Sequence, residues 1–159
     1  MTPTSINYVT GDATQPIGDG PMLIAHVCND VGAWGRGFVL AISKRWPQPE
    51  VAFRKSWQME ASRLGDVQLS NVGGSLYVVS MIAQHKLRSR GNPVPLSYAD
   101  LARCLGRVEE LAALLHASVH MPRIGCGLAG GTWDKIESLI QKHLCGAGIA
   151  VTVYDLGES

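Results

Sequence analysis

The sequence of 159 residues lacks the features that mark membrane-bound, secreted and strongly charged proteins. No apolar run approaches the roughly 20 residues of a membrane-spanning helix, and the N-terminus has no basic segment followed by an apolar core. The formal net charge is only +1, so the overall charge gives no drive toward nucleic acid or an anionic membrane. We therefore expect a cytoplasmic protein with no membrane partner.

Cysteine is present but lacks the spacing of a disulfide framework or a metal site. No C-x-x-C pair occurs, and free thiols in a reducing compartment are the expected state. Zinc needs clustered Cys and His at ligand spacing, whereas His26 lies two residues from Cys28 and His120 lies six from Cys126. We expect neither a metal nor another cofactor. The four cysteines are Cys28, Cys104, Cys126 and Cys145.

Internal repeats and low-complexity tracts are also missing from the sequence. The composition is 46% hydrophobic and 17% charged, which is ordinary for a globular domain. A chain of this length fits one domain, which can bury about 70% of its unfolded surface. We expect a single domain over residues 1–159 that acts as a monomer.

Short apolar segments alternate along the chain with segments of helical periodicity. The strands are expected at residues 6–10, 22–27, 67–72, 76–82, 119–124 and 150–155. The helices are expected at residues 38–46 and 50–64, after Ser97, and around residues 136–144. This alternation predicts an α/β fold, a three-layer α/β/α sandwich around a central mixed six-stranded sheet.

The most informative segment covers residues 118–140. A short apolar strand is followed by residues 125–131, of which four are glycine, and then by an amphipathic helix. The first N–H groups of a helix lack intrahelical partners, and glycine lets the backbone approach an anion closely. The pattern indicates a phosphate or diphosphate ligand, with a loop that merely needs tight turns as the alternative.

Residues 125–130 also match the pattern G-x-G-x-x-G of dinucleotide-binding proteins. That fingerprint belongs to the first βαβ unit, with an acidic residue about 20 positions later. Asp155 ends the last expected strand, but no sequence remains for the rest of such a sheet. The context therefore disfavours a nicotinamide-dependent oxidoreductase.

Ligands of open α/β sheets bind beyond the carboxyl ends of the strands, so three loops are expected to meet there. In the first loop, Asp12 is suited to accept a hydrogen bond from an exocyclic amine such as adenine N6, or to cap a turn. In the second loop, Asn29 and Asp30 are suited to bind hydroxyls or a water molecule. The third loop is the glycine-rich segment 125–131.

The second loop, residues 28–37, carries further candidates. Its glycines allow close backbone approach, and Trp34 offers a flat apolar wall. Arg36 is either a phosphate partner or a solvated side chain. Tyr154, on the last strand, either stacks on a base or packs in the core. The loop glycines are Gly32, Gly35 and Gly37.

These loops resemble those of a known family. The GD at residues 11–12, AHVCNDVGAWGRGFVLAI at residues 25–42 and MPRIGCGLAGGTW at residues 121–133 are similar to the three ligand loops of macrodomains, which bind ADP-ribose. The match runs in the right order over nearly the whole chain. MPRIGCGL resembles the terminal ADP-ribose glycohydrolases, whereas HVCN and GAWGRGFVLAISKRWP look more like fungal ADP-ribose 1''-phosphate phosphatases.

The resemblance implies a binding role for each loop. Adenine would lie on Asp12, the diphosphate on the amides of residues 125–131, and the distal ribose against Asn29 and residues 34–37. The implied ligand-binding residues are Asp12, Ala13, Trp34, Gly35, Arg36, Gly37, Gln84, Arg123, Gly125, Cys126, Gly127, Leu128, Ala129, Gly130 and Tyr154.

The resemblance does not extend to the catalytic pair of the glycohydrolases, a lysine nucleophile and an aspartate just after GCGL. Ala129 stands at the position of the aspartate, and Lys86 is out of register with the lysine. Any turnover is therefore expected to use an activated water molecule. Gln84 and His85, at the end of another strand, are suited to order that water.

The candidate catalytic residues are Asp30, His26 and Asn29. Asp30 is a candidate base, and His26 either donates a proton or is a satisfied core histidine. The leading hypothesis is a hydrolase acting at C1'' of the distal ribose, on ADP-ribose 1''-phosphate or on an ADP-ribosylated protein or nucleic acid. A non-catalytic ADP-ribose reader is the alternative. A nucleic-acid-binding module is a third, for which the basic segments near residues 44–63 and 86–90 are the support.

Overall fold

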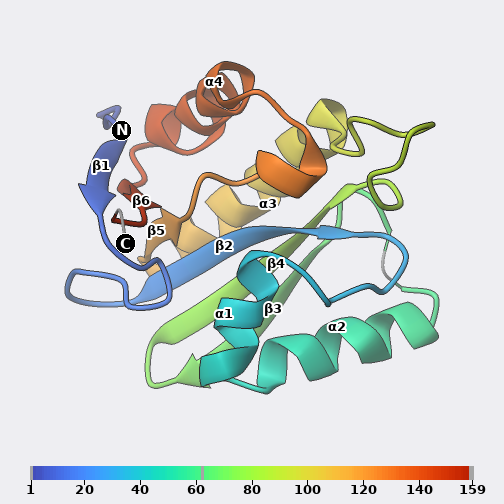
Figure 1. Cartoon of the computed structure of the whole chain (residues 1–159). Coiled ribbons are helices and arrows are strands. Elements are labelled where there is room, and N and C mark those ends of the chain that lie inside the picture. The colour runs from blue at the N-terminus through green and yellow to red at the C-terminus, as the bar shows by residue number, and fades with distance from the viewer. Residues whose placement is uncertain (1, 62, 158–159) are drawn as a thin grey trace.

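The structure is a computed structural model, and it describes residues 2–61 and 63–157. A six-stranded sheet with the order β1-β6-β5-β2-β4-β3 runs through its centre (Figure 1). All neighbouring strands are parallel except β3 and β4, which form an antiparallel pair. The strands are β1 (Asn7–Thr10), β2 (Met22–Asn29), β3 (Val67–Gly73), β4 (Leu76–Gln84), β5 (Ser118–Met121) and β6 (Val151–Asp155).

Helices cover both faces of the sheet. Figure 1 shows α1 and α2 together on one side and α3 and α4 on the other, which confirms the expected three-layer sandwich with a mixed sheet. The helices are α1 (Phe38–Arg45), α2 (Gln48–Gln58), α3 (Tyr98–Leu115) and α4 (Trp133–His143), with two short 3₁₀ turns, η1 (Gly127–Ala129) and η2 (Cys145–Ala147). In the described part of the chain, no helix has the length and apolar character of a membrane span.

Two hydrophobic cores result from the alternation of side chains along the central strand β2. Leu23 and Ala25 pack in the core beneath α3 and α4, whereas Ile24 and Cys28 pack against α1 and α2. A strand buried on both faces is typical of parallel sheets. The sheet thereby holds the carboxyl ends of β2, β4 and β5 in one fixed row.

Several boundaries differ from the expected ones. Strand β2 continues through Asn29, so the second loop begins later than its turn-forming residues suggested. Helix α2 begins at Gln48 and has a proline in its first turn, where the fixed φ of proline suits a helix and no N–H partner is lost. It ends at Gln58, and Glu60 has a φ of 56°. The expected end of this helix ran past residue 62, which lies outside the described residues.

Helix α3 begins with a side-chain cap. Ser97 is the N-cap residue, and its Oγ accepts a hydrogen bond from the Asp100 N–H at 3.2 Å. Ser97→Ala leaves that donor unpaired, so we expect it to lower the free energy of unfolding by about 1 kcal/mol. Chemical denaturation measures this change. Ser138→Ala, at an exposed position inside α4, is the control and is expected to change stability by no more than about 0.5 kcal/mol.

Candidate functional site

A cavity of about 800 Å³ opens at the carboxyl ends of β2, β4 and β5. Its volume lies within the range of roughly 300–1,000 Å³ that is usual for small-molecule sites. The second and third loops both reach it, whereas Asp12 of the first loop does not line it. The cavity is lined by residues 26–29, 33, 35–39, 84, 87–88 and 122–129.

Twelve of the residues expected from the sequence line this cavity. They are His26, Asn29, Gly35, Arg36, Gly37, Gln84, Arg123, Gly125, Cys126, Gly127, Leu128 and Ala129. The structure thus brings together residues that are up to 103 positions apart, from His26 to Ala129. Six other candidates lie outside the lining: Asp12, Ala13, Asp30, Trp34, Gly130 and Tyr154.

The glycine-rich loop turns tightly, and at two of its positions the neighbouring backbone leaves no room for a side chain. Gly125, Gly127 and Gly130 have φ angles of 72°, 60° and 73°, which glycine adopts without strain. A Cβ at Gly130 would lie 2.6 Å from the Pro93 carbonyl oxygen, and one at Gly131 would lie 2.5 Å from the Gly125 carbonyl oxygen. Glycine is therefore required at Gly130 and Gly131, where the loop closes directly after the residues that line the cavity.

The backbone N–H groups of this loop fall into two sets. Those of Ala129, Gly130 and Gly131 donate to carbonyl oxygens within the loop, at 3.3, 3.0 and 2.8 Å. Among the described residues, no acceptor is found for the N–H groups of Cys126 and Gly127, or for that of Leu128. The cradle expected over residues 125–131 is therefore confined to its first half, where free donors border the cavity.

The amino-terminal end of α1 borders the cavity from the other side. Phe38 and Val39, in its first turn, line the cavity, and the N-cap residue Gly37 makes no side-chain cap. The N–H groups of a first turn have no intrahelical acceptor and carry part of the positive end of the helix dipole. Leu128 approaches Gly37, since a Cβ built on Gly37 would lie 3.7 Å from Leu128 Cδ1. The glycine-rich loop and the amino-terminal end of α1 thus both border the cavity.

The charge of the lining is one-sided. Arg36, Arg88 and Arg123 line the cavity, and no Asp or Glu is found among the described residues that line it. Arg88 was missed by the sequence analysis as a site residue. It follows β4 in a basic loop, and its Nη1 donates to the Gly127 carbonyl oxygen at 3.2 Å. Such a lining favours an anionic ligand.

The side chain of Asn29 shapes the second loop. Its Nδ2 donates to the Ala33 carbonyl oxygen at 2.8 Å, and its Oδ1 accepts from the N–H groups of Val31 and Ala33. Asn29 is only 8% exposed. Both ends of the amide are thus used within the loop, which gives Asn29 a positioning role. Asn29 also lines the cavity, and its expected catalytic role stays a prediction.

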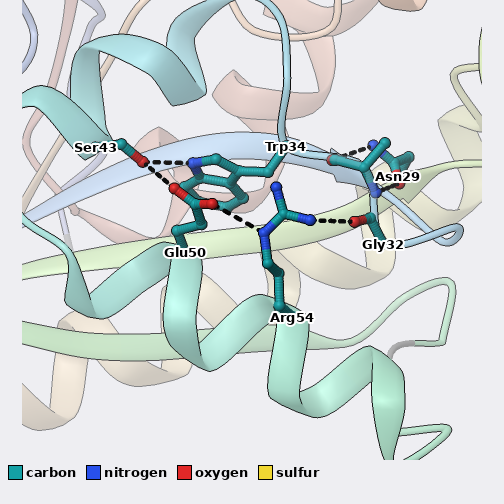
Figure 2. A network of polar contacts seen from close by, with 7 residues as sticks. Asn29, Gly32, Trp34, Ser43, Glu50 and Arg54 are labelled. Atoms are coloured by element: carbon teal, nitrogen blue, oxygen red, sulfur yellow. Dashed lines mark hydrogen bonds and ion pairs between the residues drawn. The ribbon is translucent and has the colours of Figure 1, made fainter.

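Trp34 lies in the core and does not form the expected flat wall of the ligand site. The side chain is 3% exposed, with its ring 5.3 Å from Phe53 and 5.5 Å from His26. Its Nε1 donates to Ser43 Oγ at 2.6 Å (Figure 2). A large indole is apolar enough to bury fully once its N–H has an acceptor, and Ser43 supplies that acceptor.

His26 has the environment of a satisfied core histidine. It is 2% exposed, and its Nε2 is 2.7 Å from Ser80 Oγ. Burial lowers the pKa of His26 to about 3, so the imidazole is neutral near pH 7. A neutral ring held in this way does not serve as the proton donor that the sequence suggested, although it contributes to the cavity floor.

Asp30 and His85 form an acid–histidine pair beside the cavity. Asp30 Oδ2 lies 2.7 Å from His85 Nδ1, and Asp30 Oδ1 accepts from the Lys86 N–H at 2.8 Å. The Asp30 side chain is 17% exposed and that of His85 is 55% exposed. Neither lines the cavity, but the adjoining Gln84 does. Lys86 has a left-handed backbone conformation with a φ of 59° and does not line the cavity.

The residues expected to contact adenine form hydrogen bonds within the protein or are buried. Asp12 Oδ1 accepts from Thr14 N–H and Thr14 Oγ1 at 2.8 and 2.7 Å, and these bonds hold the pKa of Asp12 below its ordinary value. Ala13 is buried. The Tyr154 hydroxyl accepts from the Ile17 N–H and bonds His120 Nδ1. Asp12 therefore caps a turn, but its side chain is 38% exposed, and its contact with a base stays a prediction. Tyr154 packs in the core, which is the alternative to stacking on a base.

Comparison with known proteins identifies the class of this fold and cleft. A macrodomain protein from Streptomyces coelicolor is 50% identical with a TM-score of 0.86, covering 96% of this chain and 100% of that chain. A protein of unknown function from Bacteroides thetaiotaomicron is 49% identical with a TM-score of 0.93, covering 96% of this chain and 98% of that one. No protein-family model matches the chain. The chain belongs to the macrodomain family, which confirms the resemblance seen in its loops.

Curated relatives extend the comparison. The mouse protein chromodomain-helicase-DNA-binding protein 1-like is 37% identical over 161 residues, which cover 95% of this chain but only 18% of that protein. An ADP-ribose 1''-phosphate phosphatase of Meyerozyma guilliermondii is 25% identical and is covered over 94% of its length. A DNA ADP-ribosyl glycohydrolase of Mycobacterium tuberculosis is 27% identical, covering 83% of this chain and 36% of that protein.

The ion pair of Arg123 and Asp155 at the cavity edge makes the stability of the protein depend on pH. Arg123 Nε and Nη2 donate to Asp155 at 2.6 and 2.9 Å, and the guanidinium lies over the rings of Tyr8 and Trp133. The Arg123 hydrogen bonds lower the pKa of Asp155. Stability from this pair is therefore present above the unfolded-state pKa of about 3.9 and is lost as the pH falls through the folded-state pKa.

We expect Arg123→Met to remove this part of the acid sensitivity, so that its unfolding free energy falls less steeply below pH 4 than that of the wild type. Urea denaturation between pH 3 and pH 7 measures it. Arg107→Met is the matched control, because Arg107 is 3.8 Å from Asp66 in a longer contact. An unchanged slope in Arg123→Met would contradict the prediction.

Proposed function

We propose that this macrodomain binds ADP-ribose in the cleft and hydrolyses a bond at C1'' of the distal ribose. The observation that carries the proposal is the set of free N–H groups at residues 126–128, which borders a cavity lined by arginine without carboxylates among the described residues. Backbone donors at a glycine-rich turn suit a diphosphate. The distal ribose then lies between residues 35–37 and Ala129.

The relatives support the two parts of this proposal. Two of them carry names of hydrolases, ADP-ribose 1''-phosphate phosphatase and DNA ADP-ribosyl glycohydrolase, at 25% and 27% identity. Both names describe cleavage of a bond to ADP-ribose. The substrates that follow for this chain are ADP-ribose 1''-phosphate and ADP-ribosylated protein or nucleic acid.

The proposed chemistry uses water, because no lysine lines the cavity within the described residues. Gln84 borders the cavity and orders the water. Asp30 holds Nδ1 of His85 and leaves Nε2 as the nitrogen that accepts the proton of the water. The hydroxide bonds to C1'' as the bond from C1'' to the leaving group breaks, and the protonated His85 returns its proton to the leaving group. Asp30 thus acts through His85.

A reader without turnover is the second candidate, and one observation favours it. No carboxylate is found among the described residues that line the cavity, and the lining histidine, His26, is buried and neutral. A binding module needs nothing more than the donors and cations already described. The two candidates differ only in turnover, so a hydrolysis assay separates them.

Gly127→Glu tests the binding site. It places bulk and negative charge beside the free amides, so we expect no measurable ADP-ribose binding by isothermal titration. Gly74→Glu is the matched control, because Gly74 has a similar φ of 54° and, like Gly127, open space around it, but lies between β3 and β4. This variant carries the same charge and backbone strain and is expected to bind normally. Equal affinity in the two folded variants would rule out the proposed diphosphate site.

Turnover is tested with ADP-ribose 1''-phosphate, ADP-ribosylated protein and ADP-ribosylated DNA. We expect His85→Ala to lower the rate by about 10²–10⁴-fold, the usual loss for a general base, with ADP-ribose affinity within threefold of wild type. His116→Ala, at the carboxyl end of α3, is the control. A reduced lysine adduct at Lys86 would contradict the water mechanism, and wild-type binding without any turnover would favour the reader.

A further inference from the structure

A ring of hydrogen bonds joins the second loop to α1 and α2, outside the cavity (Figure 2). Trp34 Nε1 donates to Ser43 Oγ at 2.6 Å, and Ser43 Oγ donates to Glu50 Oε1 at 2.8 Å. Arg54 Nε donates to Glu50 Oε2 at 2.8 Å, and Arg54 Nη1 donates to the Gly32 carbonyl oxygen at 3.4 Å. The ring therefore begins and ends in the second loop.

Glu50 is the residue at which both arms of the ring end. Each of its two carboxylate oxygens accepts one bond, one from Ser43 and one from Arg54. Hydrogen bonds from Arg54, and then from Ser43, lower the pKa of Glu50, so the side chain is a carboxylate at neutral pH. The indole N–H and the guanidinium are donors only, so the direction of every bond in the ring is fixed.

Trp34 and Gly32, the two points at which the ring of hydrogen bonds meets the second loop, are each also held by packing. Trp34 is buried against Phe53 and His26. Gly32 lies under the ring of Trp57, where a Cβ would approach Cδ2 to 2.6 Å, and its φ is 75°. Close packing thus places Trp34 and Gly32, and the ring of hydrogen bonds fixes the Trp34 indole N–H and the Gly32 carbonyl.

Residues 35–37, which follow Trp34 in the second loop, line the cavity. Gly35 has no neighbouring atom within 4 Å of a built Cβ, and Gly37 has a φ of 81°. Glycine loses more conformational freedom on ordering than any other residue, so a loop of this composition is costly to fix at the moment of binding. Its position must be set from the ends, by Trp34 and by the start of α1.

We propose that Glu50 is a positioning residue for the ligand cleft: from outside the cavity, its carboxylate fixes the Trp34 indole and the Gly32 carbonyl, and so holds residues 35–37 where they meet the ligand. The inference rests on the proposed binding of ADP-ribose. It assigns a function to three side chains that do not line the cavity, Ser43, Glu50 and Arg54.

The test is Glu50→Gln, which keeps the shape but turns one acceptor into a donor that faces Ser43 or Arg54. We expect ADP-ribose affinity to fall about tenfold by isothermal titration, because the loop is no longer preordered. We also expect faster hydrogen exchange at the Trp34 indole N–H and altered amide signals at residues 35–37 in the free protein, measured by NMR. Ser43→Thr keeps the hydroxyl and is expected to retain affinity, whereas Ser43→Ala is not.

A double-mutant cycle tests whether Glu50 acts on the loop through the Trp34 indole. Trp34→Phe keeps an aromatic ring but removes the Nε1 donor, so Glu50→Gln is expected to cost less than threefold in that background. Asp100→Asn is the matched control: Asp100 is also in the first turn of its helix and is paired with an arginine, Arg103, three residues on. This variant is expected to lose stability but to bind ADP-ribose within twofold of wild type.

The outcomes separate this inference from the proposed function. Failure of the wild type to bind ADP-ribose would overturn the proposed function, and the NMR measurements would still show whether Glu50 holds the loop. Normal affinity and unchanged signals of residues 35–37 in Glu50→Gln would overturn the positioning role while leaving the binding site intact. A loss of affinity equal to that in Asp100→Asn would also overturn it.

Discussion

The cleft depends on one steric constraint, the close approach of backbone to backbone in the glycine-rich loop. At Gly130 and Gly131 the neighbouring carbonyl oxygens stand where a Cβ would be, so no other residue allows the chain to turn back on itself there. The turn uses the amides of residues 129–131 in internal bonds, whereas no acceptor among the described residues is found for those of residues 126–128, which line the cavity. The free donors beside the cavity are therefore a consequence of how the loop closes.

The polar groups around the cleft divide into those that face it and those that support it. Donors and cations face the cavity, while carboxylates stand one layer behind. Asp30 holds His85, Glu50 holds Ser43 and Arg54, and Asp155 holds Arg123. This separation keeps negative charge away from an anionic ligand while it fixes the side chains that need a partner.

Much of the architecture could be predicted from the sequence, because strand and helix periodicity are local properties. The glycine-rich loop was also readable, since its function follows from the backbone alone. The roles of Trp34, Tyr154 and His26 could not be fixed in this way, because a large or titratable side chain at a strand end has either a ligand or a core partner. Burial decided each of these three, and burial depends on residues distant in sequence. Glu50 gave no signal, since its partners Ser43 and Arg54 become neighbours of the second loop only through the packing of α1 and α2.

The arrangement of strands has a consequence for the order in which the molecule assembles. In the described part of the chain, β3 and β4 are the one antiparallel pair of strands, and only residues 74–75 separate them in the sequence. Every other pair joins distant segments, up to β1 with β6, where Asn7 lies beside Thr152. Closing such long loops must precede the contacts that compensate for their entropy, which slows folding. The β3–β4 hairpin is therefore the part of the sheet able to form early, whereas the parallel pairs β2–β4 and β2–β5 at the cleft form only once longer loops have closed.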